Sequence, residues 1–171
     1  MNRILLLEDD VSLIDGLVYS LKKNEFDVEV ARTVCEAKQY LSELDRYDLL
    51  ILDVTLPDGT GFDVCERVRK ENQQIPIIFL TASDEEVSII RGLDSGGDDY
   101  ITKPFNTNLL ISRCNNLVNS RRLLQEKFSK QPQAFAQMLA TNPMDKEMLD
   151  RAMAIIERHL DNTCLLYTSP S

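Results

Sequence analysis

The feature that most constrains the fold is a series of short apolar runs separated by segments with helical periodicity. Unbroken apolar runs occupy residues 4–7, 49–52 and 75–80, apolar and charged residues alternate over 26–30, and residues 98–102 follow a glycine turn. Between them, apolar residues recur every three or four positions in five segments, which are 11–23, 33–45, 61–69, 83–93 and 106–130. Strands that read as continuous apolar runs and alternate with helices are typical of a parallel sheet covered on both faces. We therefore predict an α/β fold with five strands and five helices.

Three of these helices carry a start signal in the sequence. Thr33 and Asn106 each stand directly before a helical segment, where their side chains can cap it. Ser83 is followed three residues later by Glu86, which is the pattern of a capping box.

Polar residues of particular types follow the predicted strands. Glu8 and Asp9 follow the first strand, Asp53 the third, Thr81 the fourth and Lys103 the fifth. In a parallel sheet the functional site lies at the carboxyl ends of the strands, so these side chains should converge. Carboxylates crowded in one cleft repel each other and raise each other's pKa unless a cation lies among them, and Mg²⁺ is the ion that oxygen ligands of this kind suit.

The same set of residues can bind and accept a phosphoryl group. The Lys103 ammonium, the Thr81 hydroxyl and a metal ion would together stabilise phosphoryl oxygens, which makes Asp53 the natural nucleophile of an acyl phosphate. Taken singly, each residue also has a structural explanation. A lone Asp after a strand is more often a helix cap, and a Lys-Pro pair is usually part of a loop. It is the combination at successive strand ends that favours the functional interpretation.

Composition excludes several other classes of protein. His159 is the only histidine, so a histidine-rich metal site and a Ser-His-Asp or Cys-His catalytic set are excluded outside the extreme C-terminus. The four cysteines form no C-x-x-C pair, which argues against a zinc site and favours reduced thiols. Residues 1–104 carry 11 basic and 22 acidic side chains, and this acidic excess disfavours binding to nucleic acid. Residues 105–171 carry 8 basic and 6 acidic side chains. No apolar run approaches the length of a membrane span, and no signal peptide is recognisable.

Four motifs make the sequence resemble the receiver (CheY-like) domain of bacterial two-component response regulators, over residues 2–120. The motifs are LLLEDD at 5–10, LILDVTLPDGTG at 50–61, IIFLTA at 77–82 and GDDYITKPF at 97–105. The resemblance implies a flavodoxin-like, doubly wound five-stranded parallel sheet with strand order 2-1-3-4-5 and five helices, followed here by a C-terminal helical extension.

The resemblance also assigns roles to individual residues. It implies that a histidine kinase phosphorylates Asp53, and that Glu8, Asp9, Asp53 and the backbone carbonyl of Thr55 hold Mg²⁺. Such a chain is a phosphoacceptor signalling domain rather than an enzyme, because it catalyses only its own phosphorylation and dephosphorylation.

A second group of residues would bind the transferred phosphoryl group and respond to it. Lys103 would pair with it, while the Thr81 hydroxyl and the Ala82 backbone would hydrogen-bond to it. Tyr100 would be the aromatic switch whose ring turns inward, although it could also be an ordinary strand residue packed on the sheet. The bond between Lys103 and Pro104 is a candidate cis peptide.

The resemblance implies a cytoplasmic two-component response regulator that controls an output, most simply transcription. Its partners would be a sensor histidine kinase and a second copy in a homodimer. The start of the last receiver helix, 106–109, lacks the acidic position typical of regulators that dimerise through their last two helices. DNA would be contacted only through an output domain that is absent or truncated here, and no membrane is expected as a partner.

The C-terminal part divides into three predicted segments. Residues 121–144 are expected to be a helix extension and linker, and residues 145–163 an amphipathic helix that needs a partner for its apolar stripe. The latter resembles the lead-in to an AraC-type helix-turn-helix domain. Residues 164–171 match the translation of a transposase-type sequencing adapter, so we expect the natural sequence to stop near Thr163.

Three other functions are compatible with parts of the pattern. Aspartyl-phosphate phosphatases of the haloacid dehalogenase type need a second Asp two residues after the nucleophile, where this chain has Thr55. A flavodoxin-like electron carrier would place a flavin phosphate beside residues 8–10, which are all acidic and would repel it. A receiver used only as a binding scaffold would not need the complete set of acidic residues, Thr81 and Lys103.

Overall fold

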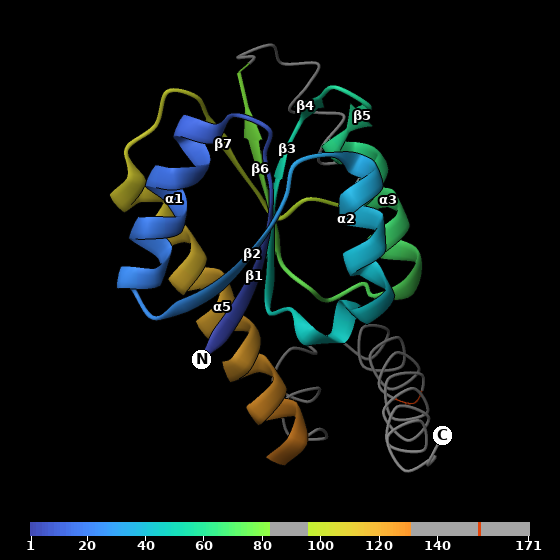
Figure 1. Cartoon of the computed structure of the whole chain (residues 1–171). Helices are drawn as coiled ribbons and strands as arrows, with labels where there is room; N and C mark the ends of the chain where they lie inside the picture. Colours follow the sequence, from blue (N-terminus) through green and yellow to red (C-terminus); the bar gives the residue numbers. More distant parts are fainter. Residues whose placement is uncertain (83–95, 131–153, 155–171) are drawn as a thin grey trace. The chain divides into compact units, whose positions relative to one another are not determined.

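Five parallel strands form the central sheet of the molecule (Figure 1). The computed structural model describes residues 1–82, 96–130 and 154, and Met1–Arg121 form its first compact unit. The strands of the sheet are β1 (Asn2–Leu7), β2 (Phe26–Ala31), β3 (Leu49–Asp53), β6 (Ile77–Thr81) and β7 (Asp99–Thr102). They lie in the order β2-β1-β3-β6-β7, which for these five strands is the order 2-1-3-4-5, so the predicted parallel α/β sheet is confirmed.

Helices cover both faces of this sheet. Figure 1 shows α1 and α5 on one face and α2 and α3 on the other. Their bounds are α1 Val11–Lys23, α2 Val34–Tyr40, the 3₁₀ helix η1 Leu41–Arg46, α3 Gly61–Glu71 and α5 Thr107–Lys130. The helix expected over 83–93 and the segments expected over 145–163 and 164–171 lie outside the described residues, apart from the single helical residue Ala154.

The side chains of the sheet alternate between two separate cores, one on each face. Leu5, Leu50 and Phe79 belong to the core beneath α2, η1 and α3. Their neighbours along each strand belong to the core beneath α1 and α5, as Leu6 and Ile51 do. Because β1 and β3 are buried on both faces, they require the unbroken apolar runs found in the sequence.

Side-chain caps fix where the helices begin. The Thr33 hydroxyl accepts the N–H of Glu36 at the start of α2, as predicted. The Asn106 side chain accepts the N–H of Asn108 at the start of α5. Thr60 caps the start of α3 and forms a reciprocal capping box with Asp63, which was not predicted from the sequence.

The structure departs from the sequence-based prediction in two places. The predicted helix over 33–45 is an α-helix only as far as Tyr40, and η1 continues it with a kink at Glu43, whose backbone angles (φ −121°, ψ 43°) are not helical. A two-stranded antiparallel hairpin, β4 (Thr55–Leu56) and β5 (Gly59–Thr60), was not predicted. This hairpin leads directly from the end of β3 into α3.

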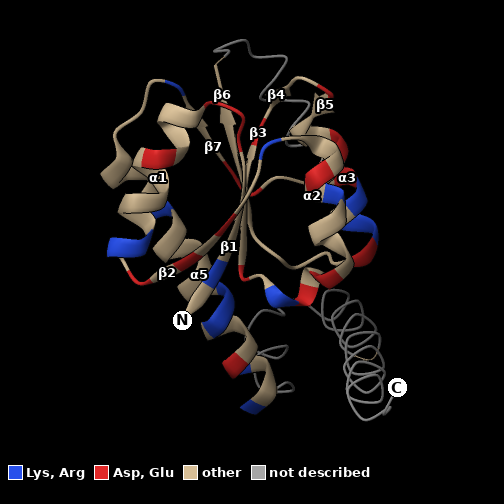
Figure 2. Ribbon diagram, in the orientation of Figure 1, with Lys and Arg blue, Asp and Glu red and all other residues tan. Residues whose placement is uncertain are grey.

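Most of the Lys, Arg, Asp and Glu residues lie on the helices and in the connecting segments, as the ribbon colours in Figure 2 show. The inner strands β1 and β3 are apolar along most of their length, and acidic residues appear where they end. Across the described residues, no helix is both long enough and apolar enough to cross a membrane.

Candidate functional site

Three carboxylates meet at the carboxyl end of the two central strands. Glu8 follows β1 directly, Asp53 is the last residue of β3, and these strands are paired up to Leu7 and Leu52. One carboxylate oxygen from each of Glu8, Asp9 and Asp53 lies within 4.8 Å of the others. Glu8 is fully buried, Asp53 is only 4% exposed and Asp9 is half-buried. The structure thus brings together the three carboxylates that the sequence analysis selected.

The ammonium of Lys103 lies against this acidic cluster. Its Nζ is 2.7 Å from Glu8 Oε2 and 3.2 Å from Asp53 Oδ2. Its backbone N–H donates to the carbonyl of Thr81 at 2.7 Å, which fixes the chain after β7 beside the end of β6. The peptide bond between Lys103 and Pro104 is cis. Sequence reasoning placed Lys103 near a phosphoryl group but did not identify Glu8 as its partner.

The other oxygen of Glu8 holds the backbone of the loop that follows β1. Glu8 Oε1 accepts the N–H of Asp9 at 3.2 Å and that of Asp10 at 3.1 Å. Asp10 has a separate role, because its carboxylate accepts the N–H groups of Ser12 and Leu13 and caps α1. Of the three consecutive acidic residues, two therefore belong to the cluster and one to the helix.

Burial and charge repulsion shift the ionisation of Asp53. Burial, followed by the charge of Glu8, raises the pKa of Asp53 from 3.8 to about 6, and Lys103 partly opposes this rise. Burial alone would lower the pKa of Lys103, but its hydrogen bond to Glu8 and the charges of Asp53 and Glu8 outweigh that effect and raise it. Lys103 therefore remains a cation at neutral pH, while ionising Asp53 costs free energy in the folded chain.

The backbone around Asp53 leaves no room for a side chain at Gly61. A Cβ atom at Gly61 would lie 2.2 Å from the carbonyl oxygen of Asp53, far closer than van der Waals contact allows. The Gly61 N–H donates to the carbonyl of Val54 at 3.1 Å, and the Thr55 N–H donates to Asp53 Oδ1 at 3.4 Å. The start of α3 is thus packed directly on the end of β3, and this approach requires glycine.

The remaining predicted site residues lie on β6 and β7. Thr81 ends β6 and is buried, and Ala82 follows it and is exposed. Tyr100 is half-buried on β7, with its ring stacked on Phe79 at a centroid distance of 5.6 Å and packed against the core beneath α2 and α3. Phe79 in turn contacts Phe62 of α3, at 4.9 Å between ring centroids.

The donor set of the acidic cluster suits a hard divalent cation. Glu8, Asp9 and Asp53 offer only carboxylate oxygens, which Mg²⁺ prefers over nitrogen or sulfur ligands. Thr55, whose carbonyl was also predicted as a ligand, is exposed two residues after Asp53. Burial and the charge of Glu8 raise the pKa of Asp53, and a cation among the carboxylates would offset both, so the residues fit the ion.

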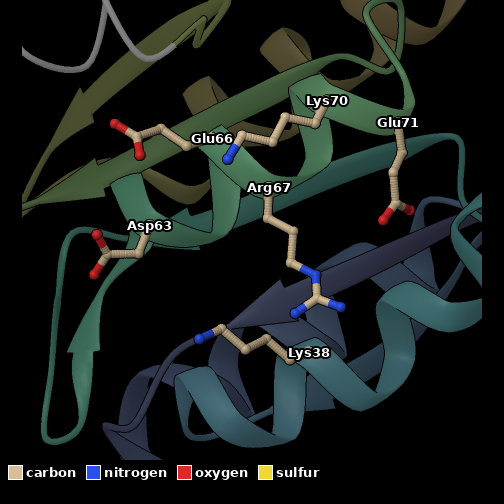
Figure 3. Close-up of a pocket in the computed structure, with 6 residues that line it drawn as sticks. All are labelled: Lys38, Asp63, Glu66, Arg67, Lys70 and Glu71. Atoms are coloured by element: carbon tan, nitrogen blue, oxygen red, sulfur yellow. The ribbon is translucent and has the colours of Figure 1, made fainter.

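A hollow of the surface lies between α2 and α3, away from the acidic cluster, and contains none of the predicted site residues. Figure 3 shows charged side chains of both signs around it, which are Lys38, Asp63, Glu66, Arg67, Lys70 and Glu71. It is open to solvent and lies on the helices rather than at the ends of the strands.

Two residues in the segment that follows Asp53 have structural roles that were not predicted from the sequence, Gly61 and Asp58. Gly61 could have been found, because a glycine at the first position of a helix is unusual unless a close approach requires it. Asp58 accepts the backbone N–H groups of Val34 and Cys35 at the start of α2, which are 24 and 23 positions away in the sequence. Nothing in the local turn sequence Pro57-Asp58-Gly59 signals such a distant contact.

Comparisons with known proteins agree with this geometry. A family model described as the response regulator receiver domain matches residues 4–115. The response regulator MprA of Mycobacterium ulcerans is 33% identical over 153 residues, which are 90% of this chain. The chain spans 66% of the length of that relative.

Two solved structures with the same fold are a receiver domain and a longer response regulator. The non-phosphorylated HemR receiver domain from Leptospira biflexa is 36% identical, covers 69% of this chain and 94% of its own, and gives a TM-score of 0.65. DrrB of Thermotoga maritima, described as an OmpR/PhoB homologue, is 27% identical with a TM-score of 0.63, over 70% of this chain and 54% of that protein.

Proposed function

Since the chain belongs to the response regulator receiver domain family, we propose that it is the phosphoacceptor switch of a two-component system, with Asp53 as the acceptor. A receiver of this family is a signalling domain rather than an enzyme with its own substrate. The observation that carries the proposal is the buried cluster at the end of β1 and β3, in which Glu8, Asp9 and Asp53 converge and Lys103 lies 3.2 Å from Asp53.

The proposed reaction transfers a phosphoryl group from a phosphohistidine of a sensor histidine kinase. A carboxylate oxygen of Asp53 attacks the phosphorus, an O–P bond forms and the N–P bond breaks. The leaving imidazole nitrogen keeps the electron pair of that bond and takes a proton from solvent. Mg²⁺ held by Glu8, Asp9, Asp53 and the Thr55 carbonyl would neutralise charge on the phosphoryl oxygens.

Other residues of this chain then bind the acyl phosphate and change their contacts in response to it. The acyl phosphate adds a charge of about −2 at Asp53. Lys103, fixed by its backbone bond to Thr81, can exchange its contact with the Asp53 carboxylate for one with a phosphoryl oxygen. We propose that the Thr81 hydroxyl and the Ala82 N–H hydrogen-bond to the same group, and that Tyr100 changes its packing on Phe79 in response.

The output and location of the protein are also part of the proposal. We propose that the receiver controls transcription through an output domain; DrrB, of which this chain covers 54%, is described as an OmpR/PhoB homologue. The resemblance of residues 145–163 to the lead-in of an AraC-type domain remains a prediction, because it concerns residues outside those described. A homodimer, contact with DNA through the output domain and a cytoplasmic location also remain predictions.

Labelling by a small phosphodonor tests the proposed function. We expect the full chain to become labelled by radioactive acetyl phosphate in the presence of Mg²⁺, and the label to be released by hydroxylamine, which cleaves acyl phosphates. Removing Mg²⁺ with EDTA should abolish labelling, because the carboxylate cluster then has no ion to neutralise the incoming phosphoryl group. A folded chain that stays unlabelled with Mg²⁺ would instead favour a receiver used as a binding scaffold.

A further inference from the structure

The carboxylate of Asp58 connects the β4–β5 hairpin, which follows Asp53, to the start of α2. Its Oδ1 accepts the N–H of Val34 at 2.8 Å and its Oδ2 accepts the N–H of Cys35 at 2.9 Å. These are the first two N–H groups of α2, so one carboxylate satisfies two donors that a helix start leaves unpaired. Asp58 itself lies in the turn between β4 and β5.

The β4–β5 hairpin that carries Asp58 begins at the site. Thr55, its first residue, donates its N–H to Asp53 Oδ1 and is the residue whose carbonyl is proposed to bind Mg²⁺. The other end of the hairpin is fixed, since Thr60 caps α3 and the Gly61 N–H donates to Val54. Leu56 of the hairpin is buried in the core beneath α2, η1 and α3. The tip meets α2 through Asp58 and through the packing of Gly59 on Val34, where a Cβ atom on Gly59 would lie 3.2 Å from Cγ2.

We propose that Asp58 is a positioning residue for the acidic site, because it clamps the hairpin tip to α2 and so fixes the backbone of Thr55 next to Asp53. This inference rests on the proposed function. The clamp persists through the neutral range, because the two N–H groups, with smaller help from Lys38, lower the pKa of Asp58 and keep it ionised. The same connection makes the start of α2 responsive to a ligand at Asp53, some 20 residues away in the sequence.

The matched control is Thr33, which caps the same helix without touching the hairpin. Its hydroxyl accepts the N–H of Glu36, so Thr33→Ala weakens the start of α2 while leaving the contacts of Asp58 in place. Asp58→Ala removes both contacts with Val34 and Cys35, and Asp58→Asn keeps a carbonyl oxygen for one of them. A general loss of helix stability would affect the Thr33 and Asp58 variants alike.

We expect Asp58→Ala to weaken Mg²⁺ binding by about tenfold, at the low end of the range for residues that orient metal ligands. Asp58→Asn should fall between it and the wild type, and Thr33→Ala should bind Mg²⁺ as the wild type does. In amide NMR spectra of the full chain, Mg²⁺ with beryllofluoride should shift the signals of Val34 and Cys35 in the wild type and in Thr33→Ala, but not in Asp58→Ala.

Three outcomes separate this inference from the proposed function. If the wild type binds Mg²⁺ and Asp58→Ala binds it equally tightly, the positioning role is wrong and the proposed function stands. If Thr33→Ala weakens binding as much as Asp58→Ala does, the effect is one of helix stability and the positioning role is again wrong. If the wild type binds neither Mg²⁺ nor beryllofluoride, the proposed function itself fails.

Discussion

Replacing Asp53 with asparagine is expected to abolish labelling by acetyl phosphate, because the amide oxygen cannot form a stable acyl phosphate. Asp45→Asn is the matched control, since Asp45 is an exposed carboxylate in η1, the helix that precedes the opposite end of β3. That variant should be labelled as the wild type is. Labelling of Asp53→Asn at the wild-type level would show that another residue accepts the phosphoryl group.

The same substitution should stabilise the protein in the absence of Mg²⁺. The folded chain raises the pKa of Asp53 to about 6, so the folded state binds this proton more tightly than the unfolded chain does. The resulting stabilisation is present at low pH and is lost as pH rises from about 4 through about 6. Since one pKa unit corresponds to about 1.4 kcal/mol, the uncharged asparagine should raise the free energy of unfolding at pH 7 by up to about 3 kcal/mol.

Urea unfolding at pH 4 and pH 7, with and without Mg²⁺, checks this second effect. The two proteins should differ at pH 7 and nearly converge at pH 4, where Asp53 is protonated in the folded wild type and partly protonated in the unfolded chain. Adding Mg²⁺ should stabilise the wild type more than Asp53→Asn, because only the wild type offers all three carboxylates to the ion. A wild type that is the more stable protein at pH 7 without Mg²⁺ would contradict the cost assigned to the Asp53 charge.

Replacing Lys103 with alanine is expected to separate phosphorylation from switching. The carboxylates remain, so Lys103→Ala should still be labelled in the presence of Mg²⁺. The ammonium that contacts both Glu8 and Asp53 is gone, so the acyl phosphate lacks the cation that connects it to the end of β7. The amide signals of Tyr100 and Phe79 should therefore not respond to phosphorylation in this variant.

Lys103→Ala should also lower the stability of the folded protein, and Mg²⁺ should restore most of it. Removing one partner of a buried ion pair destabilises a protein by about 3–5 kcal/mol, and partial exposure of Lys103 places this case near 3 kcal/mol. Mg²⁺ should restore most of that loss, because it neutralises the same carboxylates. The control is Arg113→Ala, which removes the cation 3.1 Å from Asp99, beside Tyr100, without touching the cluster. A normal response of Tyr100 in Lys103→Ala would refute the role of Lys103.

The sheet could be predicted because short apolar runs, separated by segments of helical periodicity, recur along the chain. Residues 4–7 and 49–52 are buried on both faces, so they must be apolar without interruption, and the acidic residues that end them must then meet at one edge. The convergence of Glu8, Asp9 and Asp53 follows from this topology alone. The hairpin between β3 and α3 could not be predicted in this way, because its strands have only two residues each.

Other features of the site depend on contacts that no local pattern encodes. Lys103 is hydrogen-bonded to Glu8, 95 positions away in the sequence. Asp58 is hydrogen-bonded to Val34 and Cys35, 24 and 23 positions away. Lys103 could be placed at the site from its position after a strand, but its contact with Glu8 and the contacts of Asp58 have no local signal in the sequence. Asp10 shows the opposite case, because it stands among site residues in the sequence but caps α1 in the structure.

The central claim is that the cluster of Glu8, Asp9 and Asp53 binds Mg²⁺ and then a phosphoryl group, and a two-step NMR titration tests it most directly. The chain has no tryptophan, so amide signals are a better probe than fluorescence. Mg²⁺ alone should shift the signals of residues 8–10 and 53–55, and beryllofluoride added afterwards should shift those of Thr81 and Tyr100. A spectrum of the folded protein that stays unchanged through both additions would contradict the claim.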